Sequence, residues 1–225
     1  MPIKGSGATQ LREIDRFDGG FGWIAYPKEG MQRASHALVS DGKVYVVDPV
    51  DADGLDDLLA EEGEVAGVVV LLDRHLRDAA TIANRHDVAV HIPAWMSGVE
   101  KKLDAPVERL GDALGDTGYE VRRLVDSPFW KEAALYHEGS GTLLVPETLG
   151  TVDYYTTGDE QVGVHPALRL FPPSQLRPLA VERLLVGHGA GVLENAEAHI
   201  EDAVSGSRKR APRAWMESFA SFLRS

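Results

Sequence analysis

An unbroken run of eight residues without a polar side chain, Val65-Ala-Gly-Val-Val-Val-Leu-Leu72, constrains the fold of this chain more than any other segment. A strand with this pattern is typically buried on both faces. The segment before it, 52–62, places three leucines at helical spacing among acidic residues and predicts a helix. Residues 77–86 predict a second helix, and residues 88–92 predict another apolar strand. This alternation of strands and helices predicts an α/β fold.

The remaining segments add hairpins and further helices. Two β-rich runs, Ser35–Ser40 and Lys43–Asp48, are joined by Asp-Gly, the dipeptide that best fits a type I′ hairpin turn. Further strands are expected at 119–125, 133–137, 142–145 and 184–186, and helices at 192–203 and about 212–224, with a connector at 205–212 between these helices. The sequence has no internal repeat and no long linker. We therefore expect a single domain over residues 1–225 that ends in a helix at about 212–224.

The charge balance excludes some classes of partner. The chain has 23 Lys and Arg against 35 Asp and Glu, which gives a formal net charge of −12. Such a surface repels phosphate backbones and anionic lipid headgroups, so we expect neither a nucleic acid nor a membrane as partner. The expected partner is a small-molecule substrate, and association into a homo-oligomer is left open. An excess of acids with few lysines is typical of halophilic proteins in salt-rich cytoplasm.

The absence of cysteine excludes disulfides, thiolate metal ligands and thiol nucleophiles. Phosphate-loop, nucleophile-elbow and helical zinc-protease motifs are also absent from the sequence. The start of the chain lacks the apolar core of a signal peptide, and no window approaches the roughly 18 apolar residues of a membrane span. We therefore expect a cytoplasmic protein in which any metal ion is held by histidines and carboxylates.

Polar residues recur at the ends of the expected strands in a characteristic order. The first hairpin ends in Asp48, and the apolar run is followed by Asp73-Arg-His75-Leu-Arg77-Asp78. Asp126 and Glu147 follow later strands, and the last apolar strand leads into Gly-His188. In order and spacing the chain resembles the metallo-β-lactamase fold superfamily. The resemblance implies a four-layer αββα sandwich whose metal ligands lie at one edge of two packed sheets.

The resemblance also implies a set of metal ligands. Carried over position by position, one site consists of Asp73, His75, Asp126 and Glu147. The second site of the family falls on Arg77, Asp78, Glu147 and His188. Arg77 cannot be a ligand because its guanidinium stays protonated, so a two-metal centre is not expected. Arg77 is instead expected to supply a positive charge near the second site, paired with Asp78 or Glu147, and Asp48 is expected to hydrogen-bond a ligand.

The function implied by the resemblance is hydrolysis of an ester-like or phosphoester small molecule by a metal-activated water. His188 and Asp78 are the candidate catalytic residues, with His188 orienting the substrate or acting as a general acid. One imidazole with three carboxylates favours oxygen-preferring ions such as Mn²⁺ or Mg²⁺, with Zn and Fe as further candidates. The alternative is a metal-free, non-catalytic member of the fold, in which Arg77 and the acids form a charge network and the protein binds a partner or has a structural role.

Other polar residues allow two interpretations each. His36 and His91 lie in strand-like segments and are expected to be structural. His165 precedes a proline and belongs either to the site or to an extended turn. Tyr154 and Tyr155 either donate a hydroxyl to a developing oxyanion or pack half-buried.

Overall fold

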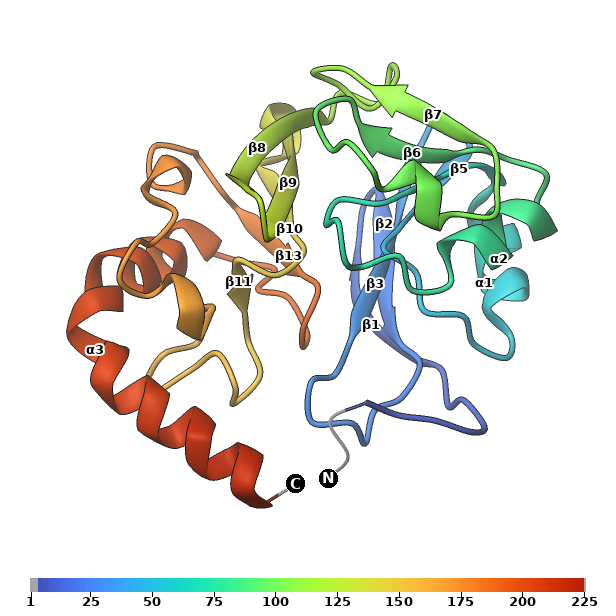
Figure 1. Ribbon diagram of the computed structural model, residues 1–225. Coiled ribbons are helices and arrows are strands. Elements are labelled where there is room, and N and C mark those ends of the chain that lie inside the picture. The colour runs from blue at the N-terminus through green and yellow to red at the C-terminus, as the bar shows by residue number, and fades with distance from the viewer. Residues whose placement is uncertain (1–3, 225) are drawn as a thin grey trace.

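The first sheet has seven strands that lie side by side in the order of the sequence (Figure 1). The computed structural model describes residues 4–224, with side chains up to residue 217. The strands are β1 (Arg12–Phe17), β2 (Gly20–Ile24), β3 (Ala34–Ser40), β4 (Lys43–Val47), β5 (Glu64–Val69), β6 (Val90–Pro93) and β7 (Val107–Leu110). Neighbours from β1 to β4 pair antiparallel, and neighbours from β4 to β7 pair parallel. The apolar run supplies β5, which lies between β4 and β6.

The turn between β3 and β4 confirms the predicted hairpin. Asp41 and Gly42 have φ angles of 50° and 72°, and both central residues of a type I′ turn need positive φ. Ser40 pairs with Lys43 directly across this turn. The hairpin register in turn fixes the position of Asp48 at the end of β4.

The second sheet has four strands in the order β13 (Arg183–Val186), β10 (Thr142–Val145), β9 (Trp130–His137) and β8 (Glu120–Ser127). β10 pairs antiparallel with β9 and parallel with β13. Two short strands, β11 (Leu149–Gly150) and β12 (Gly163–Val164), form a separate antiparallel pair. The parallel pairing of β10 with β13 matters for the site, since it places the carboxyl ends of two distant segments side by side.

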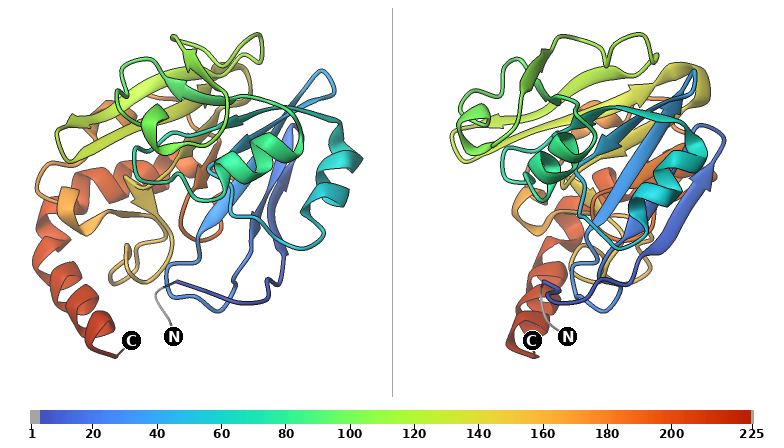
Figure 2. Two further views of the ribbon diagram at one scale, coloured as in Figure 1. Left: turned by 45° about the vertical axis from the view of Figure 1, so that its right-hand side comes forward. Right: turned by 90° about the vertical axis from the view of Figure 1, so that its right-hand side faces the viewer.

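Helices cover the outer faces of the two sheets. The helices α1 (Leu55–Glu62) and α2 (Ala79–Arg85) pack on β4, β5 and β6, and α3 (Ala196–Arg224) packs on β12 and β13. Short 3₁₀ helices occur at η1 (Glu100–Lys102), η2 (Glu138–Ser140), η3 (Pro166–Leu168) and η4 (Ser174–Leu176). The layers therefore follow the order α, β, β, α, as Figures 1 and 2 show. None of the helices within residues 4–224 is both long and apolar enough to cross a membrane.

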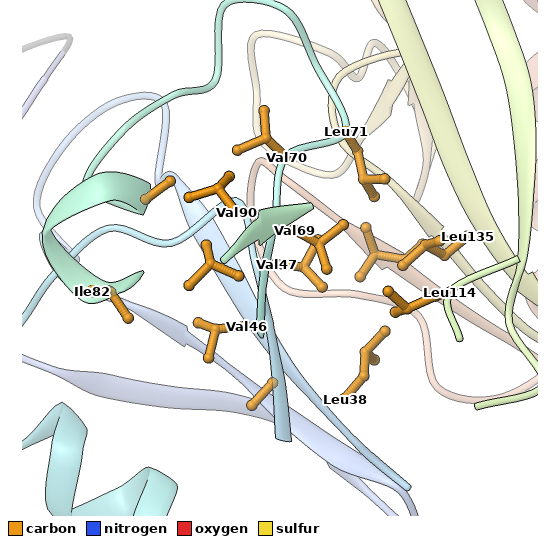
Figure 3. Packing of buried hydrophobic residues seen from close by; sticks show 14 of the residues in the cluster. Leu38, Val46, Val47, Val69, Val70, Leu71, Ile82, Val90, Leu114 and Leu135 are labelled. Atoms are coloured by element: carbon orange, nitrogen blue, oxygen red, sulfur yellow. The ribbon is translucent and has the colours of Figure 1, made fainter. Parts of the chain in front are cut away.

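Neighbouring side chains of one strand pack into different parts of the hydrophobic core. On β4, Val46 lies on the side of Ile82 from α2, whereas Val47 lies toward Leu114 and Leu135 between the sheets (Figure 3). On β10, Leu144 joins this same cluster, while its two neighbours belong to a second cluster shared with α3. Successive strand residues point to opposite faces, so both sheets need apolar residues at nearly every position. This explains why the central strands β4, β5 and β10 are almost continuously apolar, whereas the edge strands β1, β7 and β8 carry charged residues.

The C-terminal region differs from the expected connector and short helix. The connector expected at 205–212 is part of α3, which runs unbroken past Pro212. Ala211 and Ala214 are buried on either side of this proline. Burial of this face outweighs the hydrogen bond that a proline removes from a helix.

Candidate metal site

His75 lies on a segment that crosses from the first sheet to the second. After β5 the chain leaves the first sheet, and Leu71 accepts a hydrogen bond from the backbone of Ala133 on β9 (2.8 Å). The backbone N–H of Asp73 then donates to the carbonyl of Lys131 (3.1 Å), and that of His75 donates to the carbonyl of Leu72 (3.0 Å). Because both sheets hold this segment, the His75 side chain is fixed at their common edge.

Glu147 follows β10, and a buried carboxylate holds its backbone in place. Oε1 of Glu132 accepts the backbone N–H groups of Glu147 (2.9 Å) and Thr148 (2.7 Å). Oε2 of Glu132 accepts the indole N–H of Trp130 (2.7 Å). Burial raises the pKa of Glu132, although these donors lower it. Glu132 therefore anchors the turn that carries Glu147.

His188 follows β13, beside the end of β10. Val145 and Val186 are register partners in the parallel pair, so Glu147 and His188 leave the sheet at the same edge. Gly187 makes this close approach feasible, since a Cβ at its position would overlap the carbonyl oxygen of Pro146.

Replacing Gly187 with alanine should lower the free energy of unfolding by about 1–3 kcal/mol, because the added methyl group forces the ends of β10 and β13 apart. Urea denaturation followed by circular dichroism measures the change. Gly111 is a matched control, since a Cβ there meets nothing within 4 Å, and Gly111→Ala should change stability by less than about 0.5 kcal/mol. Equal stability of the two variants would show that the strand ends separate without cost.

His75, Glu147 and His188 form the one group of potential metal ligands within the described residues, with donor atoms within 4.8 Å of one another. Nε2 of His75 lies 3.2 Å from Oε2 of Glu147. The rings of His75 and His188 have centroids 5.4 Å apart. Burial alone would raise the pKa of Glu147, but the hydrogen bond and charge of His75, together with the charge of Arg74, lower it below its usual value. The carboxylate is therefore ionised and directed at the two imidazoles.

The protonation state of His188 suits a ligand. Its Nδ1 lies 2.9 Å from the carbonyl oxygen of Met31, an acceptor, so Nδ1 carries the proton. Burial and the positive charges of His75 and Arg77 place the pKa of His188 well below its usual value. Nε2 is buried and finds no hydrogen-bond partner in the described part of the chain. A neutral imidazole with one nitrogen fixed by a carbonyl and the other bearing a free lone pair is the form that binds a metal ion.

His165 also lies at the site. The sequence left open whether this histidine belongs to the site or to an extended turn. The backbone N–H of His165 donates to the carbonyl of Thr148 (3.0 Å), which brings the ring beside Glu147. Its Nδ1 accepts from the backbone of Ala167, so the neutral ring carries its proton on Nε2, 3.6 Å from Oε1 of Glu147. Burial lowers the pKa of His165 to about 4, which keeps the ring neutral. His165 thus lies beside Glu147 and offers no lone pair to a metal ion.

Comparison with known proteins identifies the fold of the chain. No protein-family model matches the chain, and no curated protein matches it by sequence. The structure is similar to DIM-1 metallo-β-lactamase, with a TM-score of 0.64 and 14% identity over 92% of this chain and 100% of that chain. It is also similar to TMB-1 (TM-score 0.60, 14% identity, 93% and 99% covered) and to the Flv1 flavodiiron core from Synechocystis sp. PCC6803 (0.64, 12% identity, 91% and 62% covered). The chain has the metallo-β-lactamase fold. This confirms the α/β sandwich expected from the sequence.

Arg77 does not form the ion pair that was expected of it from the sequence. The guanidinium donates to three backbone carbonyls, those of Ala34 (2.6 Å), Asp48 (2.7 Å) and Gly187 (3.1 Å), instead of to Asp78 or Glu147. Burial lowers the pKa of Arg77 and the nearby carboxylate of Asp48 raises it, while an arginine stays charged at neutral pH. A fixed positive charge therefore links β3, β4 and β13.

Asp48 lies beside His75, where a residue that supports a ligand is expected. Its Oδ1 accepts the backbone N–H of Leu71 (3.1 Å), and its Oδ2 lies 3.9 Å from Nδ1 of His75. Both Oδ2 and this Nδ1 are buried and have no hydrogen-bond partner among the described residues. The hydrogen bond to His75 expected of Asp48 is therefore not formed, and Asp48 instead holds the crossing segment through the backbone of Leu71.

Besides Arg77 and Asp48, three residues expected as metal ligands or catalytic groups lie outside the cluster of His75, Glu147 and His188. Asp126 forms an ion pair with Arg123 (2.8 Å), and its side chain is 40% exposed. The register of β8 shifts between Arg123 and Val125, and this shift changes which side chains at the end of β8 face the site. Asp78 precedes α2, and its Oδ2 accepts the backbone N–H of Asp51 (2.8 Å). Asp73 is drawn toward β9 by its backbone bond to Lys131. The cluster thus has two imidazoles and one carboxylate.

Proposed function

We propose that this chain is a hydrolase that holds one divalent metal ion with His75, Glu147 and His188 and cleaves an ester-like or phosphoester small molecule. The observation that carries the proposal is the buried Nε2 of His188, which is neutral, has no partner among the described residues and belongs to the His75–Glu147 cluster. Leaving such an atom unsatisfied costs about 1–3 kcal/mol. A bound ion removes that cost.

The donor set changes the metal preference expected from the sequence. Two imidazoles and one carboxylate with open positions are the ligands of catalytic zinc sites and of non-haem iron(II) sites. Mg²⁺ prefers oxygen ligands and suits this set poorly. We therefore favour Zn²⁺ or Fe²⁺, with Mn²⁺ as a further candidate. Such an ion, when bound, lowers the pKa of a water molecule and polarises the oxygen of the bond to be cleaved.

The residues around the cluster orient the three ligands. The carbonyl of Met31 fixes the tautomer of His188, and Nε2 of His165 faces Oε1 of Glu147. Glu132 holds the backbone of Glu147. Partners of this kind are typical of catalytic metal sites, where they set the direction and basicity of each ligand.

Arg77 supports a centre with one ion rather than two. Arg77 stands at a position where the second metal site of the family would need a carboxylate ligand. Its guanidinium is instead bound to three backbone carbonyls. A fixed cation in a buried position repels a second divalent ion.

The metal content of untagged protein, measured by plasma mass spectrometry, tests this proposal. We expect about one equivalent of Zn, Fe or Mn in the wild type and almost none in Glu147→Ala or His188→Ala. His86→Ala is the matched control, because His86 pairs with Asp56 at the surface, and it should retain the ion. The metal-loaded protein should hydrolyse 4-nitrophenyl acetate or 4-nitrophenyl phosphate, and Glu147→Ala should not.

A second candidate function is the metal-free, non-catalytic form of the fold. One observation favours it: the carboxylate of Glu147 is paired with Arg74 and His75, so protein groups can compensate its charge. A wild-type protein that binds no ion after incubation with zinc, manganese and iron would contradict the hydrolase and favour this candidate. Circular dichroism spectra of all variants establish that the comparison is made between folded proteins.

A further inference from the structure

Arg74 lies on the solvent-facing side of the candidate metal site. Its Nε is 3.3 Å from Oε2 of Glu147, and its Nη1 is 3.4 Å from the carbonyl oxygen of Phe129. The guanidinium stacks over the ring of Trp130, 4.1 Å from its centroid. The Arg74 side chain is 39% exposed, compared with 12% for Glu147. Arg74 is therefore more accessible to an incoming molecule than Glu147 is.

The guanidinium of Arg74 has donors to spare. An arginine carries five N–H groups in a fixed planar fork. The described residues engage Nε and one N–H of Nη1, both at distances beyond the usual 2.9–3.0 Å, and leave Nη2 without an acceptor. Stacking on Trp130 fixes the plane of the fork, so little side-chain entropy is lost when it binds an anion. The fork is thus preorganised for a carboxylate or a phosphoryl group.

The charges around the site favour an anion in spite of the net charge of −12. Arg74 and Arg77 place two cations beside the cluster, and Glu147 is the present counter-ion of Arg74. A divalent ion on Glu147 would compete for that counter-ion and leave the Arg74 charge uncompensated. Phe129, whose carbonyl contacts Arg74, is 90% exposed and offers an apolar surface next to the fork.

We infer that Arg74 is the anion-binding residue of this site, and that the substrate carries a carboxylate or phosphoryl group held by the Arg74 fork, with an apolar part near Phe129. The inference rests on the proposed function, since it names the substrate class of the same site. It assigns specificity to a residue that is not itself a ligand.

Binding of phenylphosphonate, a non-hydrolysable aryl anion, tests the inference by titration calorimetry on the metal-loaded and metal-free full chain. Arg74→Met should weaken binding to the metal-loaded chain by about 10–100-fold, because it removes charge-assisted hydrogen bonds. Arg74→Lys should lie in between, and the neutral diethyl ester should bind the wild type and Arg74→Met equally. Arg123 is a matched control, since it also stacks on a tryptophan, Trp95, and pairs with a carboxylate, and Arg123→Met should change affinity less than about 2-fold.

The outcomes separate this inference from the proposed function. Unchanged affinity in Arg74→Met, or an equal loss in Arg123→Met, overturns the anion site, as does a wild-type chain that binds no phenylphosphonate in either form. Failure to bind any metal ion overturns the hydrolase by itself. If the chain binds no metal ion but still binds phenylphosphonate through Arg74, the anion site is retained and the hydrolase is abandoned.

Discussion

Replacing Arg77 with methionine should lower the free energy of unfolding by about 3–5 kcal/mol, the cost of breaking a buried charged cluster by removing one partner. The variant leaves the carbonyls of Ala34, Asp48 and Gly187 without their donor and leaves the buried Asp48 carboxylate without the nearby cation. Arg77 has a φ of 42°, a strained value that methionine shares, so the backbone term cancels in the comparison. Urea unfolding followed by circular dichroism measures the loss.

Two variants sharpen this measurement. Arg85→Met removes a guanidinium that pairs with Asp51 and Asp56 at the surface, and we expect a loss below about 1 kcal/mol. Arg77→Lys keeps the charge but not the planar fork, so its stability should lie between those of the wild type and Arg77→Met. A loss below about 1 kcal/mol for Arg77→Met would show that the three carbonyls do not depend on this side chain.

Replacing Glu132 with alanine should lower the free energy of unfolding by a similar amount, about 3–5 kcal/mol. The backbone N–H groups of Glu147 and Thr148 and the indole N–H of Trp130 all lose their acceptor. Each buried donor left unpaired costs about 1–3 kcal/mol, and water entering the vacated space recovers part of the sum. Thermal and urea unfolding report the loss. Metal affinity should fall as well, because Glu147 is no longer held.

Glu201→Ala serves as the control for Glu132→Ala. Glu201 pairs with Arg177 on the surface of α3, where loss of one carboxylate should change stability by less than about 1 kcal/mol. Glu132→Gln should retain part of the stability, since one amide oxygen replaces one carboxylate oxygen. If Glu132→Ala were as stable as Glu201→Ala, the carboxylate would not be the anchor of the Glu147 turn.

The fold follows largely from local sequence signals. The strand β10 and the β3–β4 hairpin have the predicted positions, and the apolar run supplies β5. The run leaves the first sheet after Val70, because its last two residues, Leu71 and Leu72, pair with β9. Apolar pattern shows that a segment is buried but does not show which sheet receives it. The connector expected at 205–212 rested on turn residues, whose local preference is overridden by burial of Ala211 and Ala214 on α3.

The site was less predictable than the fold, since it depends on pairings between distant segments. Spacing alone placed His75, Glu147 and His188 at strand ends, and the structure brings these three together. Asp126 pairs with Arg123 instead, because a shift of register within β8 is not visible in composition. His165 reaches Glu147 through the pairing of β11 with β12, and a histidine before a proline gives no local sign of that contact.

The parallel pairing of β10 with β13 has a consequence for the order of events during synthesis. His75 and Glu147 leave the ribosome well before His188, and at about 5–20 residues per second roughly 6–23 s separate the first of these ligands from the last. Until β13 adds to the edge of the second sheet, the nascent chain offers only part of the donor set. If the proposed site holds an ion, capture would wait until nearly all of the fold has assembled, and the cation pool in which the protein completes its folding would contribute to the choice of metal.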